Sequence, residues 1–439
     1  MDIITPRVLK GFRDFLPQAE IVRRGLSEKI EASFRSFGFV PIDTPALEYA
    51  EVLLAKGGGD VEKQIYRFND NGGRDVAMRF DLTVPFARFT ALHQGELIFP
   101  FKRYHIGKVW RGENTQRGRY REFTQCDFDI IGDDSAASDF EILLIIRDTL
   151  AALGVSVSIH LNHRGLFNRL LSRLGVIEKS IEIFHIVDRR AKVPHAETLE
   201  TLAAAAGADG AGEILKFIGV DPATGAQADG EAFEDTLKRT TEMAGGDCPE
   251  AARLADLRRF MLDAGGSDVF KLNPSITRGL DYYTGVVFET FLTDMPDIGS
   301  ICSGGRYDNL AGLYCKTNIS GVGSSIGLDR MVSALESLDR LPAGGTYAKA
   351  AVCCLKAEHS GLYQALAGRF RREGVPCEVF IEEAGDKLTK QFVLSEKKGV
   401  PFLIIPGESP LSDPLTVRDI AKRQSHEGLS FDQALAMIR

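Results

Sequence analysis

The sequence predicts an α+β protein that consists of a sheet-containing domain, a helical insertion and a small C-terminal α/β domain. Two strand-like runs with a polar connection occupy 99–131, an Ala-, Leu- and Glu-rich stretch with helical periodicity occupies 164–265, and strand-like and helical runs alternate after 346. At about 150 residues per domain, 439 residues favour roughly three domains, or one large domain with additions. The hydrophobic fraction of 44% and the charged fraction of 26% exclude a disordered or collagen-like chain.

The N-terminal part mixes helix and strand signals. Residues 19–37 place apolar side chains on one face of a predicted amphipathic helix, which Gly38 is expected to end. The segment FVPIDTPALE (39–48) then predicts a short strand interrupted by prolines. Residues 99–131 predict an antiparallel hairpin with a long loop, because two β-branched and aromatic runs flank the polar, glycine-containing GENTQRG.

The second half of the chain changes character twice. Helical periodicity in FNRLLSRL and ARLADLRRFML predicts a largely helical module, after which a strand-like pattern returns at 268–292. The Pro- and Gly-containing linker LPAGGT (341–346) precedes apolar runs (KAAVCCL, CEVFI, PFLIIP) that alternate with helical segments (GLYQALAGRFRRE, LTKQFVLSEKKG). Alternating strands and helices predict a small α/β domain at the C-terminus.

The predicted hairpin is strongly basic, and Glu113 is its only acid between residues 101 and 121. Its basic residues are Lys102, Arg103, Lys108, Arg111, Arg117, Arg119 and Arg121. Like charges at this density repel one another, so the hairpin is expected either to face a polyanion, such as a triphosphate or a nucleic-acid end, or to be a solvated basic ribbon. The net charge of −8 argues against nucleic acid only on average, because the basic residues are concentrated here and in GRFRRE (368–373).

Polar side chains recur on the return strand and in an earlier segment. A period of two places Gln125, Asp127 and Asp129 on one face, where they could bind an ammonium or imidazole group or pair with surface arginines. The segment MRFDLTVPFAR (78–88) is predicted to be a strand with Asp81 and Thr83 on one face. Alternation of this kind fits either a half-buried sheet or a site.

Three glycine-bearing segments are further candidates for ligand binding. TRGLDYYTG (277–285) and CSGGRYDNL (302–310) combine glycines, which permit a close approach to the backbone, with Arg and Tyr donors. GVGSSIGLDRM (321–331) places small residues before a predicted helix whose N-terminus favours anions, although tight packing uses the same residues. None of the three fits a P-loop or a dinucleotide-binding fingerprint.

Other classes of site are not indicated. No histidine pair has metal-ligand spacing, so no metal site on the protein is predicted. The seven cysteines are scattered and odd in number, which favours reduced thiols. Because the N-terminus has no apolar run behind a basic cluster and no stretch approaches the ~20 apolar residues of a membrane span, we expect a soluble, cytoplasmic protein without a membrane partner.

Taken together, these segments resemble the class II aminoacyl-tRNA synthetases, and among them the histidyl-tRNA synthetase family. KGFRDFLP (10–17) is similar to the N-terminal signature of that family, 37–48 to class II motif 1, 101–132 to motif 2 and 321–331 to motif 3. RGLDYYTG and GGRYD are more specific, since they resemble the two histidine-recognition motifs. The similarity covers nearly the whole chain.

The resemblance implies a class II synthetase-type antiparallel sheet with flanking helices, a helical insertion and a C-terminal α/β domain of the anticodon-binding type. The implied parts are a catalytic domain at 1–163 and 268–340, a mainly helical insertion at 164–267 and an anticodon-binding domain at 346–439. Motif 1 implies a homodimer. The implied partners are histidine, ATP, Mg²⁺ and the histidine tRNA.

For ATP, the resemblance carries over four residues. Arg111 matches the arginine that binds the α-phosphate and the substrate carboxylate, and Glu113 matches the acid that reads the adenine amino group. Arg330 matches the arginine on the far phosphates. Arg278 matches the arginine that approaches the α-phosphate during activation, so Arg278 and Arg111 are the expected catalytic residues.

For histidine, the resemblance carries over six further positions. The expected partners of the α-amino group are Asp81, Thr83 and Gln125, those of the imidazole are Asp129 and Tyr283, and Tyr282 lines the same pocket. Asp81 and Asp129 are shorter acids than the glutamates of other members. Pro410 stands where an acid is common in the anticodon-binding domain.

The function implied is ATP-dependent ligation of histidine to its tRNA through a histidyl-adenylate. The alternative is a catalytically inactive paralogue that acts as a regulatory subunit of ATP phosphoribosyltransferase or as a tRNA-sensing module. The presence of a C-terminal domain together with Arg111, Arg278 and Arg330 favours the ligase.

Overall fold

The computed structural model describes residues 3–55, 59–227, 230–277, 282–308, 310–341, 345–381, 388–412 and 414–439. The chain divides into two compact units: one contains residues 26–340 together with the N-terminus up to Arg13, and the other contains 14–25 and 341–439. The first unit carries the cleft described below. Among the described residues, no helix has both the length and the apolar character needed to cross a bilayer.

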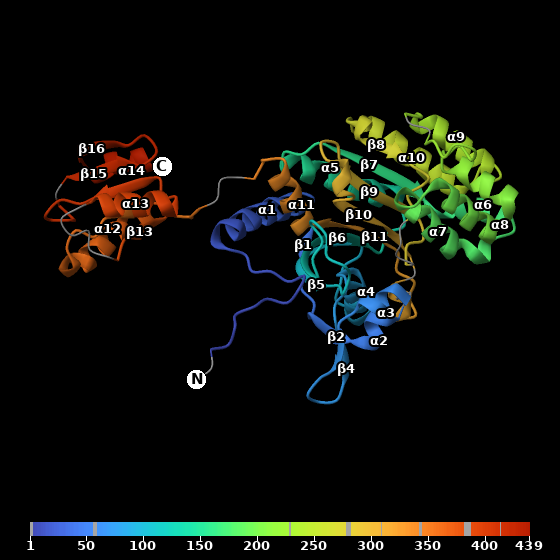
Figure 1. Cartoon of the computed structure of the whole chain (residues 1–439), viewed down its shortest axis with the longest axis horizontal. Coiled ribbons are helices and arrows are strands. Elements are labelled where there is room, and N and C mark those ends of the chain that lie inside the picture. The colour runs from blue at the N-terminus through green and yellow to red at the C-terminus, as the bar shows by residue number, and fades with distance from the viewer. Residues whose placement is uncertain are drawn as a thin grey trace. The chain divides into compact units, whose positions relative to one another are not determined.

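An eight-stranded sheet forms the centre of the first unit (Figure 1). Its strands, in spatial order, are β1 (Val40–Pro41), β5 (Phe101–Trp110), β6 (Glu122–Ile131), β11 (Gly321–Gly327), β10 (Cys302–Tyr307), β9 (Val286–Leu292), β7 (Val157–His163) and β8 (Phe270–Leu272). All neighbours are antiparallel except the two edge pairs, β1 with β5 and β7 with β8. The implied antiparallel sheet is therefore confirmed.

The predicted hairpin at 99–131 is confirmed as β5 and β6, which pair over their whole lengths. Their register places Arg103 directly opposite Asp129 and His105 opposite Asp127. On the other side of β6, β11 brings Gly323 opposite Asp129. Strands that are far apart in sequence thus meet at the same point of the sheet.

The strand predicted for 78–88 is wrong. β4 (Asp75–Met78) ends before Asp81, and Thr83 begins helix α4 (Thr83–His93). Asp81 Oδ1 accepts a hydrogen bond from the Val84 backbone N–H at 3.0 Å, as a residue at a helix start does, and Pro85 lies in the first turn, where no N–H is needed. Side-chain capping, rather than strand alternation, explains the polar positions.

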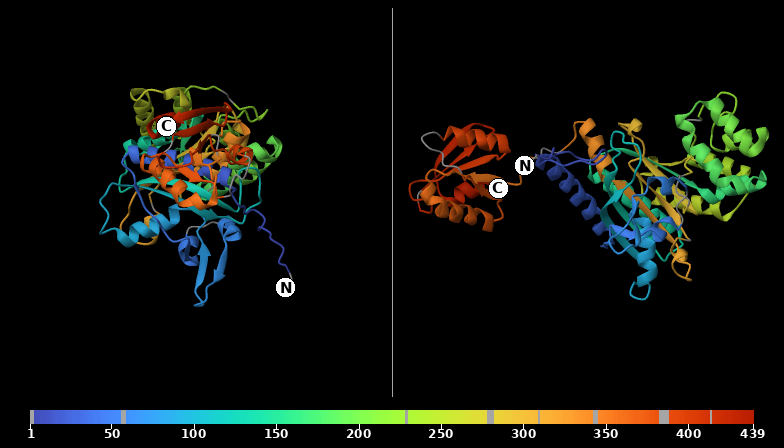
Figure 2. Two further views of the ribbon diagram at one scale, coloured as in Figure 1. Left: turned by 90° about the vertical axis from the view of Figure 1, so that its left-hand side faces the viewer. Right: turned by 60° about the horizontal axis from the view of Figure 1, so that its bottom comes forward.

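A small three-stranded sheet lies beside this helix. It has the order β2 (Leu47–Tyr49), β4, β3 (Arg67–Asn69), with the short helices α2 (Ala50–Leu54) and α3 (Gly59–Gln64) between β2 and β3 in the chain. The single strand predicted for 39–48 is thus divided between β1, in the large sheet, and β2, in this one. The β3–β4 hairpin projects at the bottom of the left-hand view of Figure 2.

Three helices that pack on the large sheet are α1 (Pro17–Ser36), α5 (Ala136–Ala152) and α11 (Leu328–Ser337). The amphipathic helix predicted for 19–37 is confirmed as α1, whose Ile30 and Phe34 are fully buried. The Phe34 ring lies 4.6 Å from that of Phe128 on β6. Gly38 follows the helix with φ of +80°, a conformation that other residues adopt only with strain.

Between β7 and β8 the described residues form five α-helices, which gather at one side of the large sheet (Figure 1). They are α6 (Arg164–Arg173), α7 (Ser180–Arg189), α8 (His195–Phe217), α9 (Phe233–Met243) and α10 (Pro249–Asp263). A non-helical residue, Gly207, interrupts α8 with φ of +77°. The predicted helical character of 164–265 is confirmed.

A buried charge cluster joins these helices to the sheet. Arg306, on β10 in the GGRYD segment, is 1% exposed, and its guanidinium donates to Asp139 Oδ1 on α5 at 2.8 Å. The other carboxylate oxygen of Asp139 accepts from Arg253 Nε on α10 at 2.6 Å. One fully buried carboxylate therefore bridges two arginines from elements that are far apart in sequence, and Asp134 and Asp308 supply the further negative charge near them.

The C-terminal unit has a five-stranded mixed sheet. Its order is β13 (Cys377–Val379), β12 (Ala350–Val352), β14 (Phe402–Ile405), β15 (Leu415–Asp419) and β16 (Gln424–Leu429), with helices α12 (Ser360–Arg372), α13 (Thr389–Lys398) and α14 (Phe431–Ile438). The predicted α/β character is confirmed. All seven cysteines of the chain are free, and Cys353, Cys354 and Cys377 are buried in this unit.

We predict that Asp139→Ala lowers the free energy of unfolding of the first unit by about 3–5 kcal/mol, because it removes the fully buried carboxylate 2.8 Å from Arg306 and leaves only the more exposed Asp134 and Asp308, at 3.4 and 3.6 Å. The only tryptophan, Trp110 on β5, reports this unit in urea denaturation followed by fluorescence. The matched control is Asp256→Ala, which removes an exposed pair with Arg259 and is expected to cost less than about 1 kcal/mol. Equal losses for the two variants would contradict this account.

Candidate active site

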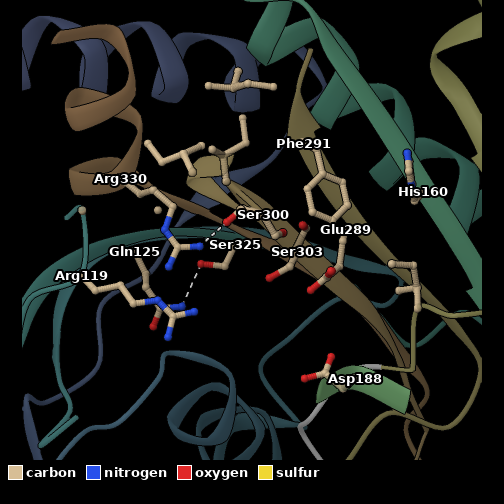
Figure 3. Close-up of a pocket in the computed structure, with 18 of the residues that line it drawn as sticks. Arg119, Gln125, His160, Asp188, Glu289, Phe291, Ser300, Ser303, Ser325 and Arg330 are labelled. Atoms are coloured by element: carbon tan, nitrogen blue, oxygen red, sulfur yellow. Dashed lines mark hydrogen bonds between the residues drawn. The ribbon is translucent and has the colours of Figure 1, made fainter. Parts of the chain in front are cut away.

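A cleft of about 1630 Å³ opens over the large sheet. Strands β6, β9, β10 and β11 each place side chains in it, and Figure 3 shows Gln125, Glu289, Ser303 and Ser325 from these strands facing a common space. Arg119 and Arg330 lie at one side of the cleft, and His160 and Asp188 lie at the opposite side (Figure 3).

The structure brings the expected site residues together in this cleft. Those that line it are Asp81, Thr83, Arg111, Glu113, Gln125, Asp129, Tyr282, Tyr283 and Arg330. They come from separate segments of the chain between residues 81 and 330. Arg278 lies outside the residues that the structure describes.

Asp129 forms an ion pair inside the sheet. Its Oδ2 lies 2.6 Å from Arg103 Nη2, and both side chains are buried. Its Oδ1 accepts a hydrogen bond from the Tyr307 hydroxyl at 2.5 Å. Burial raises the pKa of Asp129, while Arg103 and the Tyr307 hydroxyl act in the opposite direction by stabilising the carboxylate. Asp129 is therefore a fixed acceptor at the cleft.

Gly323 makes room for this carboxylate. A Cβ at this position would lie only 1.9 Å from Asp129 Oδ1, closer than any non-bonded contact allows. The glycine-rich strand β11 is thus needed for close packing against Asp129. The sequence also indicated an anion site at the start of the following helix. Gly323 has no part in that prediction, and Arg330, in the first turn of this helix, lines the cleft.

The two tyrosines and Thr83 form one side of the cleft. The ring centroids of Tyr282 and Tyr283 are 4.7 Å apart, and Tyr307 meets Tyr282 edge to face at 6.2 Å. Burial, with the nearby charge of Asp81, raises the pKa of Tyr282 well above its usual value, so its hydroxyl stays protonated and can donate.

Gln125 and Asp81 provide acceptors near these rings. Gln125 Nε2 donates to Ser325 Oγ at 2.8 Å, while its buried Oε1 has no hydrogen-bond partner among the described residues. Burial raises the pKa of Asp81, and Arg111 and Arg103 oppose that shift by favouring the carboxylate. An amide oxygen and a carboxylate on one side of a cleft match the needs of an ammonium group.

Arg111 is held by contacts on both sides of its guanidinium. Its Nε donates to the Phe80 carbonyl at 3.0 Å, and its Cζ lies 4.4 Å from the Phe80 ring and 5.2 Å from the Phe123 ring. Burial lowers the pKa of Arg111, although an arginine still remains cationic. A cation that is fixed in a poorly hydrated place binds an anionic ligand strongly.

A second pair of arginines flanks Glu113. Arg119 Nη1 lies 3.4 Å from Glu113 Oε2, and Arg330, the third residue of α11, donates to the Ser300 carbonyl (Figure 3). Burial, together with the neighbouring charges of Arg119 and Arg111, lowers the pKa of Arg330 to about 10. Cations that repel one another across a cleft favour an anion between them.

The basic hairpin is only partly a surface for a polyanion. Lys102 pairs with Glu141, Arg103 with Asp129, and Lys108 with Glu122, so the cations on the strands are neutralised within the protein. The arginines that line the cleft lie beyond the end of β5, at Arg111, Arg117 and Arg119. For the loop, the polyanion interpretation stays a prediction, and the solvated-ribbon interpretation is wrong for Arg103, which is buried.

Sequence reasoning did not single out Glu289, which lines the cleft. It named four other residues in or beside the cleft only as members of the basic hairpin or of CSGGRYDNL: Arg103, Arg119, Ser303 and Tyr307. Tyr307 belongs to the GGRYD segment, so its motif was a usable signal. Arg103 was counted among surface cations, because nothing local in the sequence reveals that the alternate face of β5 is buried.

Within the described part of the chain, no three His, Cys, Asp or Glu side chains are grouped so that they could hold a metal ion. Two separate carboxylates, Glu113 and Glu289, line the cleft, and both stabilise the charge of Arg330. Carboxylates beside fixed cations fit a Mg²⁺ that would enter with an anionic ligand and be bound mainly through the oxygens of that ligand.

Comparison with protein families gives two matches. Residues 11–331 match the family described as histidyl-tRNA synthetase, and residues 349–439 match an anticodon binding domain. The first range contains the whole cleft lining, and the second covers most of the C-terminal unit.

Relatives and solved structures agree with these matches. A histidine–tRNA ligase of Treponema denticola is 52% identical, covering 91% of this chain and 88% of its own, and one of Helicobacter hepaticus is 41% identical over all of both chains. The crystal structure of histidyl-tRNA synthetase from Nostoc sp. PCC 7120 has a TM-score of 0.86 at 28% identity and covers 99% of each chain. An ATP phosphoribosyltransferase regulatory subunit/histidyl-tRNA synthetase from Bacillus halodurans C shares the fold, with a TM-score of 0.72 at 20% identity, covering 90% of this chain and 97% of its own.

We predict that Asp127→Asn makes the stability of the first unit less dependent on pH. Burial raises the pKa of Asp127 to about 7, with Arg103 opposing and Asp129 and Asp81 reinforcing the shift. A carboxyl group whose pKa is higher in the folded state stabilises the fold most below its unfolded pKa of about 3.9, and this contribution is lost as the pH rises towards 7.

The stability of the Asp127→Asn variant relative to the natural protein is therefore expected to rise by about 2–3 kcal/mol between pH 5 and pH 8. Urea denaturation followed by Trp110 fluorescence at both pH values measures it. Comparing the two proteins at each pH removes the pH dependence of the groups that do not interact with Asp127. A difference that is independent of pH would show that Asp127 is ionised throughout this range.

Proposed function

Because this chain belongs to the histidyl-tRNA synthetase family, it is a histidine–tRNA ligase, and we propose that its cleft carries out both steps of that reaction. In the first step histidine and ATP form histidyl-adenylate and pyrophosphate, and in the second histidine passes to the 3′ end of its tRNA. The observation that most supports this assignment of the site is the convergence of all nine described candidate residues on one cleft.

We propose that Asp129 and Tyr283 select the imidazole ring. The ion pair with Arg103 and the bond from Tyr307 fix Asp129, so that it presents acceptor lone pairs without rearrangement. A side chain without ring N–H groups would leave this buried carboxylate without its ligand partner, which discriminates far more strongly than a missing methylene. Tyr282 lines the pocket beside Tyr283.

The α-amino group is proposed to lie near Asp81, Thr83 and Gln125. The nearby Arg111 and Arg103 favour the charged form of Asp81, and the Gln125 Oε1 atom is an unused acceptor among the described residues. The ammonium group of histidine would then donate to the Gln125 Oε1 atom, which otherwise has no hydrogen-bond partner among the described residues. This accounts for a buried amide oxygen that is otherwise costly to maintain.

Activation is proposed to depend on arginines rather than on a protein nucleophile. A carboxylate oxygen of histidine attacks the α-phosphorus, a new P–O bond forms, and the bond from the α-phosphorus to the bridging oxygen of the β-phosphate breaks, releasing pyrophosphate. Arg111 draws together the two anionic reactants and stabilises the charge that builds on the phosphorus. Arg278 is expected to assist there, Arg330 to bind the far phosphates, and Glu113 to accept from the adenine amino group.

Mg²⁺ is proposed to enter with ATP. Glu289 is the cleft carboxylate proposed to bind it, directly or through water, since Glu113 is assigned to the adenine amino group. When bound, Mg²⁺ offsets part of the negative charge of the phosphates. The fixed cations Arg111 and Arg330 orient the nucleotide from the protein side.

In the second step a hydroxyl of the terminal ribose attacks the carbonyl carbon of the adenylate, and AMP leaves. The cleft continues past the arginines towards His160 and Asp188, which leaves room for a nucleotide end (Figure 3). We propose that 349–439 contacts the anticodon and that the helices between β7 and β8 contact the acceptor stem. Arg372 is exposed on α12, whereas Arg369 packs over the Phe431 ring at 4.0 Å and serves the domain itself.

We also propose a homodimer and a cytoplasmic location. Three apolar side chains of the motif 1 region are substantially exposed: Val40 is 47%, Leu47 is 38% and Tyr49 is 51% exposed. A second copy that covers them would remove this apolar area from water. The location follows from the free cysteines and from the tRNA substrate.

The first test is histidine-dependent exchange between ATP and pyrophosphate with the purified chain. Exchange is expected with histidine and not with phenylalanine or glutamine, since neither fulfils the pairing at Asp129. No exchange at any histidine concentration would favour the alternative of an inactive paralogue, whatever the tRNA binding. Charging of the histidine tRNA then tests the second step.

The second test concerns the imidazole pocket. Asp129→Ala is expected to raise the KM for histidine by at least about 100-fold, which is the scale on which a buried polar partner discriminates, while the KM for ATP stays within about 2-fold. Tyr283→Phe, which removes only a hydroxyl, is the milder companion variant. Trp110 fluorescence shows whether each variant is folded, and an unchanged histidine KM in a folded Asp129→Ala protein would remove Asp129 from the pocket.

A further inference from the structure

The N-terminal segment 10–13 contacts two parts of the cleft that are far from it in sequence. Arg121, at the start of the return strand, donates from its backbone N–H to the Gly11 carbonyl at 2.8 Å and from Nη1 to the Lys10 carbonyl at 3.5 Å. Arg13 Nη2 lies 2.6 Å from Asp329 Oδ1 on α11. The segment therefore connects the loop that carries Arg111 to the helix that carries Arg330.

Arg13 itself makes both connections. Besides pairing with Asp329, its guanidinium lies over the Tyr120 ring, with Cζ 3.8 Å from the centroid. Tyr120 and Asp329 both line the cleft. An arginine that stacks on one face and donates in its plane fixes both neighbours at once, which a lysine cannot do.

Asp329 is the more demanding partner, because its side chain is only 3% exposed. Its second oxygen, Oδ2, accepts from the Thr124 backbone N–H on β6 at 2.7 Å, so the carboxylate ties the start of α11 to the sheet. Without Arg13, this anion would stand next to Arg330 and repel the polyphosphate that Arg330 is proposed to bind. Neutralising it favours both the position of the helix and the charge of the cleft.

The packing leaves little freedom in these contacts. Gly11 has φ of +88°, and a Cβ there would lie 2.7 Å from Arg121 Cγ. On the far side of the same loop, a Cβ at Gly118 would lie 3.5 Å from Arg330 Cγ. The Arg111 backbone N–H donates to the Arg121 carbonyl at 2.9 Å, so the residue that the N-terminal segment binds also pairs with Arg111.

We propose that Arg13 is a positioning residue for ATP: by binding Tyr120 and Asp329 together, it keeps the two phosphate-binding arginines, Arg111 and Arg330, at the spacing that the triphosphate needs. Arg13 itself touches neither substrate. The proposal rests on the assignment of ATP to this cleft. It gives a mechanistic role to the KGFRDFLP segment, whose part in the reaction the site residues leave unexplained.

The test is histidine-dependent ATP–pyrophosphate exchange by Arg13→Ala. The KM for ATP is expected to rise about 10-fold or more and kcat to fall, while the KM for histidine changes less than about 2-fold, because the contacts of Arg13 lead to the arginines proposed for ATP. Arg13→Lys keeps the charge without the stacked, planar donor and is expected to recover part of the ATP affinity. A loss of folding alone would raise both KM values or neither.

A double-mutant cycle gives the sharper comparison. If Arg13 acts through Asp329, Arg13→Ala combined with Asp329→Asn is expected to be no worse than the poorer single variant, whereas independent roles give multiplied losses. Arg259→Ala, which removes an exposed arginine–aspartate pair of 2.8 Å on α10, is the control with unchanged exchange. Trp110 fluorescence confirms that each variant is folded.

Three results would overturn the proposal: unchanged ATP kinetics in Arg13→Ala, equal rises of both KM values, or multiplied losses in the double variant. Each presumes that the natural chain catalyses exchange. If the natural chain shows no exchange, the proposed function is wrong. If the natural chain shows exchange and one of the three results is obtained, only the role of Arg13 is wrong.

Discussion

The buried ion pair of Arg103 and Asp129 is the constraint on which the rest of the cleft depends. A carboxylate inside a sheet must have its charge balanced and its lone pairs bound, or it would be neutral and displaced. Four strands satisfy this requirement at one point: β5 provides Arg103, β6 Asp129, β11 the Cβ-free Gly323, and β10 the hydroxyl of Tyr307. The register of the sheet is thereby tied to the position of one acceptor.

A second constraint is that the position of each charge, paired inside the fold or facing the cleft, matters more than the net charge of the chain. The net charge of −8 conceals cations that are paired on the strands and cations that face the cleft only at the loop end of the hairpin. Arg306, Asp139 and Arg253 repeat the same arrangement between the sheet and its helices, where one buried carboxylate bridges two arginines and Asp134 adds a second negative charge. Arg111 and Arg330 differ because their balancing anion is proposed to be the nucleotide. Arginines can align an anionic substrate only where the anions of the protein do not fully balance their charge.

The local sequence pattern predicted secondary structure correctly wherever the burial of one face of a single helix or strand produces that pattern. The amphipathic α1, the β5–β6 hairpin and the alternating elements of the C-terminal unit were all predicted correctly, since burial there follows a simple period. The strand predicted around Asp81 was wrong, because a side chain that caps a helix produces the same polar spacing as a strand face. The segment 39–48 was predicted as one strand, yet its two halves belong to two sheets.

By itself the sequence determined the fold class, the family and nine candidate residues that line the cleft, because motifs are contiguous and a resemblance transfers them position by position. Only the tertiary structure decided which charges are balanced: that Arg103 is buried against Asp129, that Asp127 has a pKa of about 7, and that Arg13 reaches Asp329 across 316 positions. The physical reason is that desolvation and Coulomb interactions depend on distances between segments, which packing alone sets.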